Sequence, residues 1–397
     1  MFLFDPAGLY DVFWDKSDIY RFFKRLHMSN KVKKSAVYIS KFNWIFSAGY
    51  NGIFPVIFII VLGAVLYSNI YNSPFQFDDN FYIVRNFTIR NLQVPHLIWQ
   101  KNTARFVPLF TFAVNYHIGK LDVAGYHIFN VIIHLAASVL VYFLMRLTFD
   151  APNMKKDDLA GGSVYISFLT AIIFLVHPVQ TQSVTYISQR ITSLAGMLYL
   201  SAMVFYVKAR LLQHGGSGAG IYIKYFIAAC TAAVLCFLTK EVTLTLPIMI
   251  LLYEFIFFKK EEGQKVQYIV ITFITLLSVF LLAARTLGLN LRNFHEILGG
   301  RSSNISSGHY FLTQMRVIIT YIRLLLFPVN QNIDYNYPLI KTALDPGFLI
   351  SISFLAVVGI SAVYMMKRNR IISFGVFWFF LVISPQSSFI AAPDLIL

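Results

Sequence analysis

The sequence predicts an all-α polytopic membrane protein, and three observations support that prediction. Hydrophobic residues make up 57% of the 397 residues and charged residues only 13%, with a mean hydropathy of +0.64. Apolar runs long enough to cross a bilayer recur from one end of the chain to the other. These runs are continuous rather than alternating, which argues against a transmembrane β-barrel. A soluble globular protein is not expected from this composition.

Residues 1–50 form a basic arm ahead of the first apolar run. By the positive-inside rule this arm is cytoplasmic. Such cytoplasmic segments account for the net charge of +15, so no nucleic-acid partner is expected. The arm lacks an apolar core followed by small residues, so no cleavable signal peptide is expected. Cys230 and Cys236 share one apolar run and are interpreted as core residues rather than a disulfide or a metal pair.

Residues 51–397 are predicted to form one membrane domain. The apolar runs expected to cross the membrane are 52–70, 126–147, 164–176, 194–207, 221–238, 242–258, 266–284, 348–365 and 371–383. They give about nine spans, with the N-terminus inside and the C-terminus outside. In the loop between the first two spans, residues 92–99 and 106–117 have the spacing of helices lying at the membrane surface.

The run 311–327 is interrupted by Arg316 and Arg323, each of which would be costly at the bilayer centre. We therefore expect another surface helix there, which also keeps the basic segment 367–370 on the cytoplasmic side. The chain stops at residue 397, where a further apolar run begins, and we expect a truncated or split product.

This topology gathers the unusual polar residues on the outer side of the membrane. The residues are Asp78, Asp79, Arg105, His177, Gln182, Arg190, Lys240 and Glu241. His127, Asn130 and His134 follow the spacing i, i+3, i+7 and form one polar stripe along the second span. Ionisable groups within or beside membrane helices are candidates for function.

Each candidate also has a structural interpretation. Asp78 and Asp79 would serve equally to cap a helix or to bind a divalent cation such as Mg²⁺ or Mn²⁺. The histidine stripe is more typical of packing than of metal ligation. Lys240 and Glu241 form a self-neutralising pair at a turn, and Arg190 would serve as an interface anchor.

The combination of an outer carboxylate, nearby cations and an apolar scaffold favours chemistry on a lipid-phosphate-linked sugar. The lipid tail would enter from the bilayer, and its phosphate needs Arg or Lys partners. Because a lipid phosphate is a good leaving group, only a general base for the acceptor hydroxyl is required. One of the two aspartates would be that base, and the neighbouring carboxylate would raise its pKa.

Several motifs also resemble one known family. They are Phe77-Asp78-Asp79 with Asn86; Arg105-Phe106-Val107-Pro108-Leu109; Asn115-Tyr116; Gly125-Tyr126-His127-Ile128-Phe129-Asn130-Val131; the run 176–190 from Val176-His177-Pro178 to Gln189-Arg190; Thr239-Lys240-Glu241; and Phe327-Pro328-Val329-Asn330 with Asp334-Tyr335. This ordered set is similar to the TMTC-type membrane mannosyltransferases and their bacterial TPR-linked relatives.

The resemblance implies a GT-C-type helical bundle and a glycosyltransferase that uses a polyprenyl- or dolichyl-phosphate sugar at the outer or lumenal face. It implies an Asp of the first loop as base, Arg190 and Lys240 as partners of the donor phosphate together with Arg105, and a protein or glycan acceptor. His127, Asn130, His134, His177, Gln182 and Glu241 would support the site.

The sequence also departs from that family. Gln182 stands where the family usually has Glu, and Ile191-Thr192 stands where it has Ser-Asp. The TPR repeats are absent, so acceptor recognition is expected from a TPR-containing continuation or a neighbouring chain.

One alternative remains open, a non-catalytic relative or a transporter or flippase of lipid-linked glycans. A transporter would place charges near the midplane and show repeats, whereas here the charges collect at one face. The triplets Asn86-Phe87-Thr88 and Asn304-Ile305-Ser306 fit the glycosylation pattern, and a glycan on the first would obstruct the site. We therefore expect a bacterial inner membrane rather than the endoplasmic reticulum.

Overall fold

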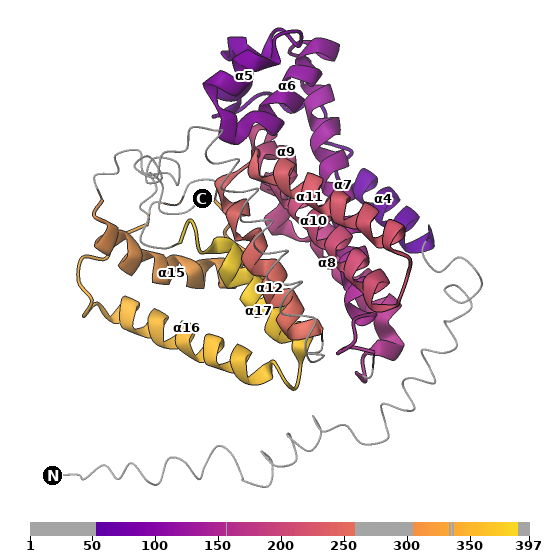
Figure 1. Ribbon diagram of the computed structural model, residues 1–397. Helices are drawn as coiled ribbons and strands as arrows, with labels where there is room; N and C mark the ends of the chain where they lie inside the picture. Colours follow the sequence, from indigo (N-terminus) through magenta and orange to yellow (C-terminus); the bar gives the residue numbers. More distant parts are fainter. Residues whose placement is uncertain (1–52, 156, 259–304, 333–334, 336, 388–397) are drawn as a thin grey trace, which may run out of the picture. The chain divides into compact units, whose positions relative to one another are not determined.

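The structure is a computed structural model that describes residues 53–155, 157–258, 305–332, 335 and 337–387. The chain divides into two compact units, Met1–Phe58 and Ile59–Leu397. Of the first unit only residues 53–58 are described, and the basic arm 1–50 lies outside the described residues. Within the described ranges every regular element is helical and no strand occurs, which confirms the all-α prediction (Figure 1).

Ten helices of twelve or more residues account for most of the described chain. They are α4 (Ile53–Leu66), α6 (Phe106–Gly119), α7 (Val123–Phe149), α8 (Ser163–Val176), α10 (Arg190–His214), α11 (Ala219–Phe237), α12 (Leu246–Phe257), α15 (Ser307–Leu326), α16 (Pro346–Met365) and α17 (Arg370–Ile383), of which α4 belongs in part to the first unit. Shorter helical pieces connect them: η1 (Asn80–Val84), η2 (Phe87–Ile89), α5 (Pro95–Lys101), η3 (Thr103–Arg105), η4 (Ala160–Gly162), η5 (Pro178–Gln180), α9 (Thr181–Thr185), η6 (Ile187–Gln189) and η7 (Glu241–Thr245).

Four of the described helices are long and apolar enough to cross a membrane, namely α7, the continuous segment Ile187–His214, α11 and α16. A fifth candidate is the pair Ala160–Val176 and Pro178–Thr185, which is bent by 49°. The predicted span 266–284 lies outside the described residues. The count of about nine spans is therefore not confirmed and stays a prediction. Helix α15 is not among these candidate spans, and its expected place at the membrane surface stays a prediction.

Local sequence explains where several helices begin and end. Asp122 and Asp345 cap α7 and α16, each accepting a hydrogen bond from a backbone N–H in the first turn. Helix α8 ends at Val176, the last residue of the predicted span 164–176, and the extended His177 before Pro178 follows it. The predicted span 242–258 is wrong in its first turn, because residues 241–245 form η7 and α12 begins at Leu246 with Pro247 in the first turn.

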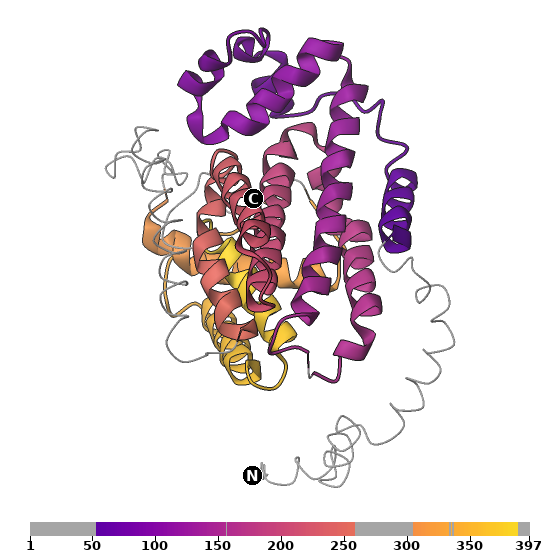
Figure 2. The same ribbon diagram turned by 45° about the vertical axis from the view of Figure 1, so that its right-hand side comes forward.

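Helix α10 lies at the centre of the bundle. It packs against α7 on one side and α11 on the other, and α8 packs against α7 (Figure 2). Its buried residues join those of α7, α11 and α12 in one hydrophobic core, against which the aromatic face of α17 also packs. The middle of α10, between Arg190 and Arg210, is thus buried in this core.

Residues 71–122, which we call the cap, form a second small core. Ile83, Ile89, Ile98 and Phe112 are buried there against Ile187 and Ile191, which belong to the loop and the start of α10. Asn86 is 3% exposed and caps η2, accepting from the Thr88 N–H and from Lys101 Nζ. The cap is thereby packed onto the first turn of α10.

Candidate functional site

The two neighbouring aspartates lie in different environments. The turn that carries them has Phe77 at a φ of +38°, a strained value for a bulky residue. Asp79 is 1% exposed; its Oδ2 accepts from Gln76 N at 2.9 Å and its Oδ1 from Ser188 N at 2.7 Å. Asp78 is exposed, and its backbone N–H donates to Tyr186 Oη at 2.8 Å. Asp79 is thus held inside the protein while Asp78 faces outward.

Burial raises the pKa of Asp79 above its usual value. The N–H groups of Gln76 and Ser188 and the nearby His127 oppose that rise. Two adjacent carboxyl groups with different surroundings can take different chemical roles. The exposed Asp78 carboxylate is able to contact a substrate, whereas both oxygens of the Asp79 carboxylate already accept backbone N–H groups.

Arg190 is fully buried at the first position of α10. Its Nε donates to Asn130 Oδ1 at 2.7 Å, its Nη1 to Asn115 Oδ1 at 2.5 Å, and its Nη2 to the Tyr126 carbonyl at 2.9 Å. The guanidinium also lies over the rings of Phe112 and Phe129, at 4.5 and 4.6 Å from their centroids. A phosphate could reach Arg190 only if these contacts opened.

The polar stripe of α7 is buried, and its contacts are to the protein itself. His127 Nε2 lies 2.9 Å from the Ser73 carbonyl oxygen, and His134 Nε2 lies 3.0 Å from that of Leu175. His127 Nδ1 is buried and has no hydrogen-bond partner among the described residues. His127 thus contacts the loop that precedes η1, and His134 contacts the last turn of α8.

The described residues do not fit a divalent cation. They contain no group of three His, Cys, Asp or Glu side chains placed to hold a metal ion. Both carboxylate oxygens of Asp79 already accept backbone N–H groups. Coordination of Mg²⁺ or Mn²⁺ by oxygen atoms would need more ligands than Asp78 and Asp79 supply.

A second polar group forms where the cap meets the turn between α11 and α12. Arg105 donates through Nη1 to Tyr82 Oη, in the helical turn that directly follows Asp79, and its Nε lies 3.9 Å from Glu241 Oε1. Lys240 Nζ donates to Thr192 Oγ1 at 2.9 Å. The Val107 N–H donates to the Leu238 carbonyl at 3.1 Å, which fixes the two segments together.

Desolvation lowers the pKa of Lys240 to about 8, an effect to which Arg105 adds and which Glu241 opposes. Burial thus disfavours the charged ammonium group, and an anionic ligand would stabilise it. Among the candidate cations, Lys240 and Arg105 are half-buried and Arg190 is fully buried.

His177 and Gln182 lie on the connection between α8 and α10. His177 Nδ1 accepts from Val179 N at 3.2 Å, and its Nε2 lies 3.1 Å from the Leu325 carbonyl oxygen near the end of α15. Gln182 is half-buried on α9. His177 thus joins two parts of the bundle, and no contact brings it to the aspartates.

A large cavity of about 590 Å³ lies inside the bundle. Its walls are mostly apolar and come from α7, α8, α10, α12 and α17, with Val141, Phe174 and Trp378 among them. Polar residues of the connections η5, α9 and η7 and of the first turn of α10 also line it: Gln180, Ser183, Thr192, Ser193 and Thr243. Since Thr192 accepts from Lys240, the ammonium group lies beside this polar part of the cavity wall.

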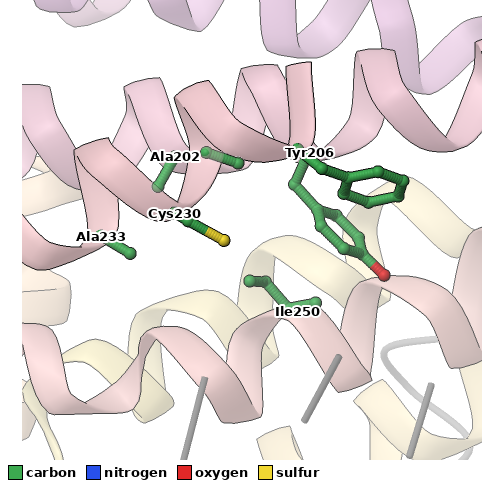
Figure 3. A pocket seen from close by; sticks show the side chains of 7 residues that line it. Ala202, Tyr206, Cys230, Ala233 and Ile250 are labelled. Atoms are coloured by element: carbon green, nitrogen blue, oxygen red, sulfur yellow. The ribbon is translucent and has the colours of Figure 1, made fainter. Parts of the chain in front are cut away.

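A second cavity, of about 20 Å³, is a packing gap rather than a site. Figure 3 shows Tyr206 of α10 and Cys230 of α11 around it, with Ile250 of α12 opposite. Both cysteines are free, as the sequence predicted, with Cys236 buried and Cys230 half-buried.

The cavity, Tyr186, Ser188 and Thr192 were not among the candidates that the sequence indicated. A cavity depends on how side chains from five helices meet, and no local pattern encodes it. Tyr186 and Ser188 lie within the motif 176–190, so their place in that motif was the only signal available.

Comparison with known proteins relates the chain to one group. It is 27% identical over 334 residues to the protein O-mannosyl-transferase F38B6.6 of Caenorhabditis elegans, a match that covers 77% of this chain and 44% of that protein. It is 26% identical over 203 residues to human TMTC4, covering 45% of this chain and 27% of that protein, and 28% identical over 150 residues to mouse TMTC3, covering 38% and 14%.

The chain spans less than half the length of these curated relatives. No family model matches it, and no solved structure matches it. All three relatives are named protein O-mannosyl-transferases, and two of them carry TMTC names, which confirms the resemblance that the motifs indicated.

Proposed function

We propose that this TMTC-like chain is an integral-membrane glycosyltransferase that transfers a mannose-like hexose from a polyprenyl- or dolichyl-phosphate carrier to a hydroxyl group of a protein or glycan. The observation that carries the proposal is that the Lys240 ammonium group, bonded to Thr192, adjoins the polar wall of a large apolar cavity. The names of the relatives support the mannosyl type and the protein acceptor.

The cavity suits the carrier lipid. Its apolar walls between α7, α8, α10 and α17 would accept the first isoprene units of the tail. Lys240 would then bind the phosphate, with Arg105 as the second cation and Glu241 holding the Arg105 guanidinium. Charge-assisted hydrogen bonds of this kind would favour the phosphate as it leaves.

Asp78 is the proposed general base, because its carboxylate is exposed and Asp79 is not. It would take the proton from the acceptor hydroxyl as that oxygen attacks the anomeric carbon of the sugar. The bond between this carbon and the phosphate oxygen breaks, and the lipid phosphate leaves with the electron pair. Asp79 would hold the turn through Gln76 and Ser188.

The reaction is proposed to take place at the outer or lumenal face, with the N-terminus in the cytoplasm, and we place the chain in a bacterial inner membrane. A TPR-containing continuation or neighbour would select the protein acceptor.

The test measures transfer of radiolabelled mannose from polyprenyl-phosphate mannose in membranes that carry the chain, together with donor binding to the purified protein. Asp78→Asn is expected to lower kcat by about 100-fold and to leave donor binding unchanged.

Gly196→Leu would fill the cavity, since Gly196 lines it and a Cβ there meets no atom within 4 Å. We expect this variant to bind the donor poorly. Gly359→Leu is the matched control, because Gly359 of α16 is equally unobstructed and lies outside the cavity wall. Donor binding without transfer would indicate a non-catalytic relative, and equal binding by both glycine variants would remove the cavity from the proposal.

A further inference from the structure

We propose that Arg190 is a positioning residue, which fixes the turn that holds both aspartates instead of binding the donor phosphate. Its catalytic consequence rests on the function proposed above, whereas the positioning itself is a property of the fold. The inference starts from an uncommon feature, a fully buried guanidinium with no carboxylate at ion-pair distance among the described residues.

The guanidinium group of Arg190 has only neutral hydrogen-bond partners among the described residues. All of its hydrogen bonds go to neutral groups of two helices: Thr111 and Asn115 on α6, and Asn130 and the Tyr126 carbonyl on α7. A buried charge without a paired acid is costly, and an apolar side chain of similar size would avoid that cost. What the guanidinium provides is a fixed geometry, because one planar group joins α6, α7 and the start of α10.

Asn130 joins Arg190 to the turn 184–188. Asn130 accepts from Arg190 through Oδ1, and its Nδ2 donates to the carbonyls of Val184 and Ile187, each at 3.3 Å. An amide that bonds on both sides has its orientation fixed. Arg190 thus sets the orientation of Asn130, and Asn130 holds the turn at two points.

The turn 184–188 is in turn hydrogen-bonded to both aspartates. Ser188 N donates to Asp79 Oδ1 at 2.7 Å, and Tyr186 Oη accepts from Asp78 N at 2.8 Å. Both residues of the Asp78-Asp79 pair are therefore held by the same five-residue turn. A shift of this turn would move the proposed base directly.

The test compares Arg190→Lys and Asn130→Ala with Arg210→Lys as a matched control. Arg210 is the other buried arginine of α10, and its partner is Glu254 on α12 rather than the turn. Hydrogen exchange measured by mass spectrometry reports on the positioning without any substrate. Loss of the hydrogen bonds that join Arg190 and Asn130 to the turn 184–188 should speed amide exchange in residues 75–84 and 181–190 by about tenfold or more in the two test variants. Arg210→Lys should instead affect the segment around Glu254.

Kinetics then separate positioning from phosphate binding. A displaced base lowers kcat by about 100-fold and leaves the KM for the donor nearly unchanged. Tyr186→Phe, which removes only a hydroxyl from a half-buried ring, should show the same split if the core variants fail to fold.

Unchanged exchange together with a raised donor KM in Arg190→Lys would overturn the proposal and make Arg190 a phosphate ligand. If the wild type transfers no sugar, the proposed function fails, and the exchange pattern alone still decides whether Arg190 positions the turn.

Discussion

Asp78 and Asp79 are adjacent in sequence, yet the structure places them in different environments, one exposed and one buried. Substituting Asp79 by Asn should destabilise the protein by about 1–3 kcal/mol, because an amide oxygen can replace only one of the two acceptors and its NH₂ then faces a backbone N–H. Asp78→Asn should change stability by no more than about 0.5 kcal/mol. Thermal unfolding of both variants in detergent measures this difference, and equal effects would contradict the separate roles.

The lowered pKa of Lys240 leads us to expect that donor binding depends on pH. Its pKa of about 8 means that the ammonium group loses its charge as the pH rises through that value, while the donor phosphate stays anionic. The KM for the donor should therefore rise above pH 8 in the wild type. Lys240→Arg keeps its charge throughout this range and should show a flat profile, although its geometry differs. A flat wild-type profile would exclude Lys240 as a phosphate partner.

At the scale of single residues, the sequence could indicate candidate side chains, whereas their contacts are visible only in the structure. The pair Arg105 and Glu241 was placed on one side of the membrane from topology alone, and the structure brings the two side chains to 3.9 Å. Arg190 was interpreted from the resemblance as a phosphate partner, and its complete burial could not be foreseen. Burial depends on Asn115 and Phe112, which come from a distant helix.

Among the helices, α10 and α12 are joined by one ion pair. Arg210 donates to both carboxylate oxygens of Glu254, at 2.8 and 3.1 Å, and Tyr206 Oη donates to the same carboxylate at 3.0 Å. Glu254→Gln should destabilise the bundle by about 3–5 kcal/mol, because it leaves a buried guanidinium without its counter-charge.

Replacing both partners, as in Arg210→Met with Glu254→Met, should recover most of that loss, since apolar packing can substitute for a buried pair. Thermal unfolding of the single and double variants gives the coupling between the two residues. A double variant as unstable as Glu254→Gln would mean that the pair itself stabilises the bundle.

Helix existence was predictable, whereas helix boundaries and breaks were only partly so. The run 126–147 became α7, Val123–Phe149, because its apolar spacing is long and its cap residue Asp122 is local. The run 242–258 gave no sign of the break at Leu246 beyond Pro247. The segment between the predicted spans 164–176 and 194–207 contains η5, α9 and η6, and Asn130 of α7 holds it at Val184 and Ile187.

For the molecule as a whole, the cavity links ligand binding to stability. A lipid phosphate that occupies it should raise the unfolding temperature in proportion to the logarithm of its concentration. Polyprenyl phosphate without the sugar is the suitable probe, added to wild type and to Gly375→Leu, since Gly375 lines the cavity and has open space at its Cβ. The variant should show no shift, and an equal shift in both proteins would place the lipid elsewhere.

The buried Asn86 has a consequence for the life of the chain in a cell. Its amide is occupied by Thr88, Lys101 and the Tyr82 carbonyl, so an enzyme that attaches N-glycans can reach it only before the cap folds. If the chain is expressed in a eukaryotic secretory pathway with this loop in the lumen, the fraction of chains glycosylated at Asn86 should depend on how fast the cap folds. This fraction should be low in the wild type and higher in Lys101→Ala, which loosens the cap. A gel shift that an endoglycosidase removes measures it.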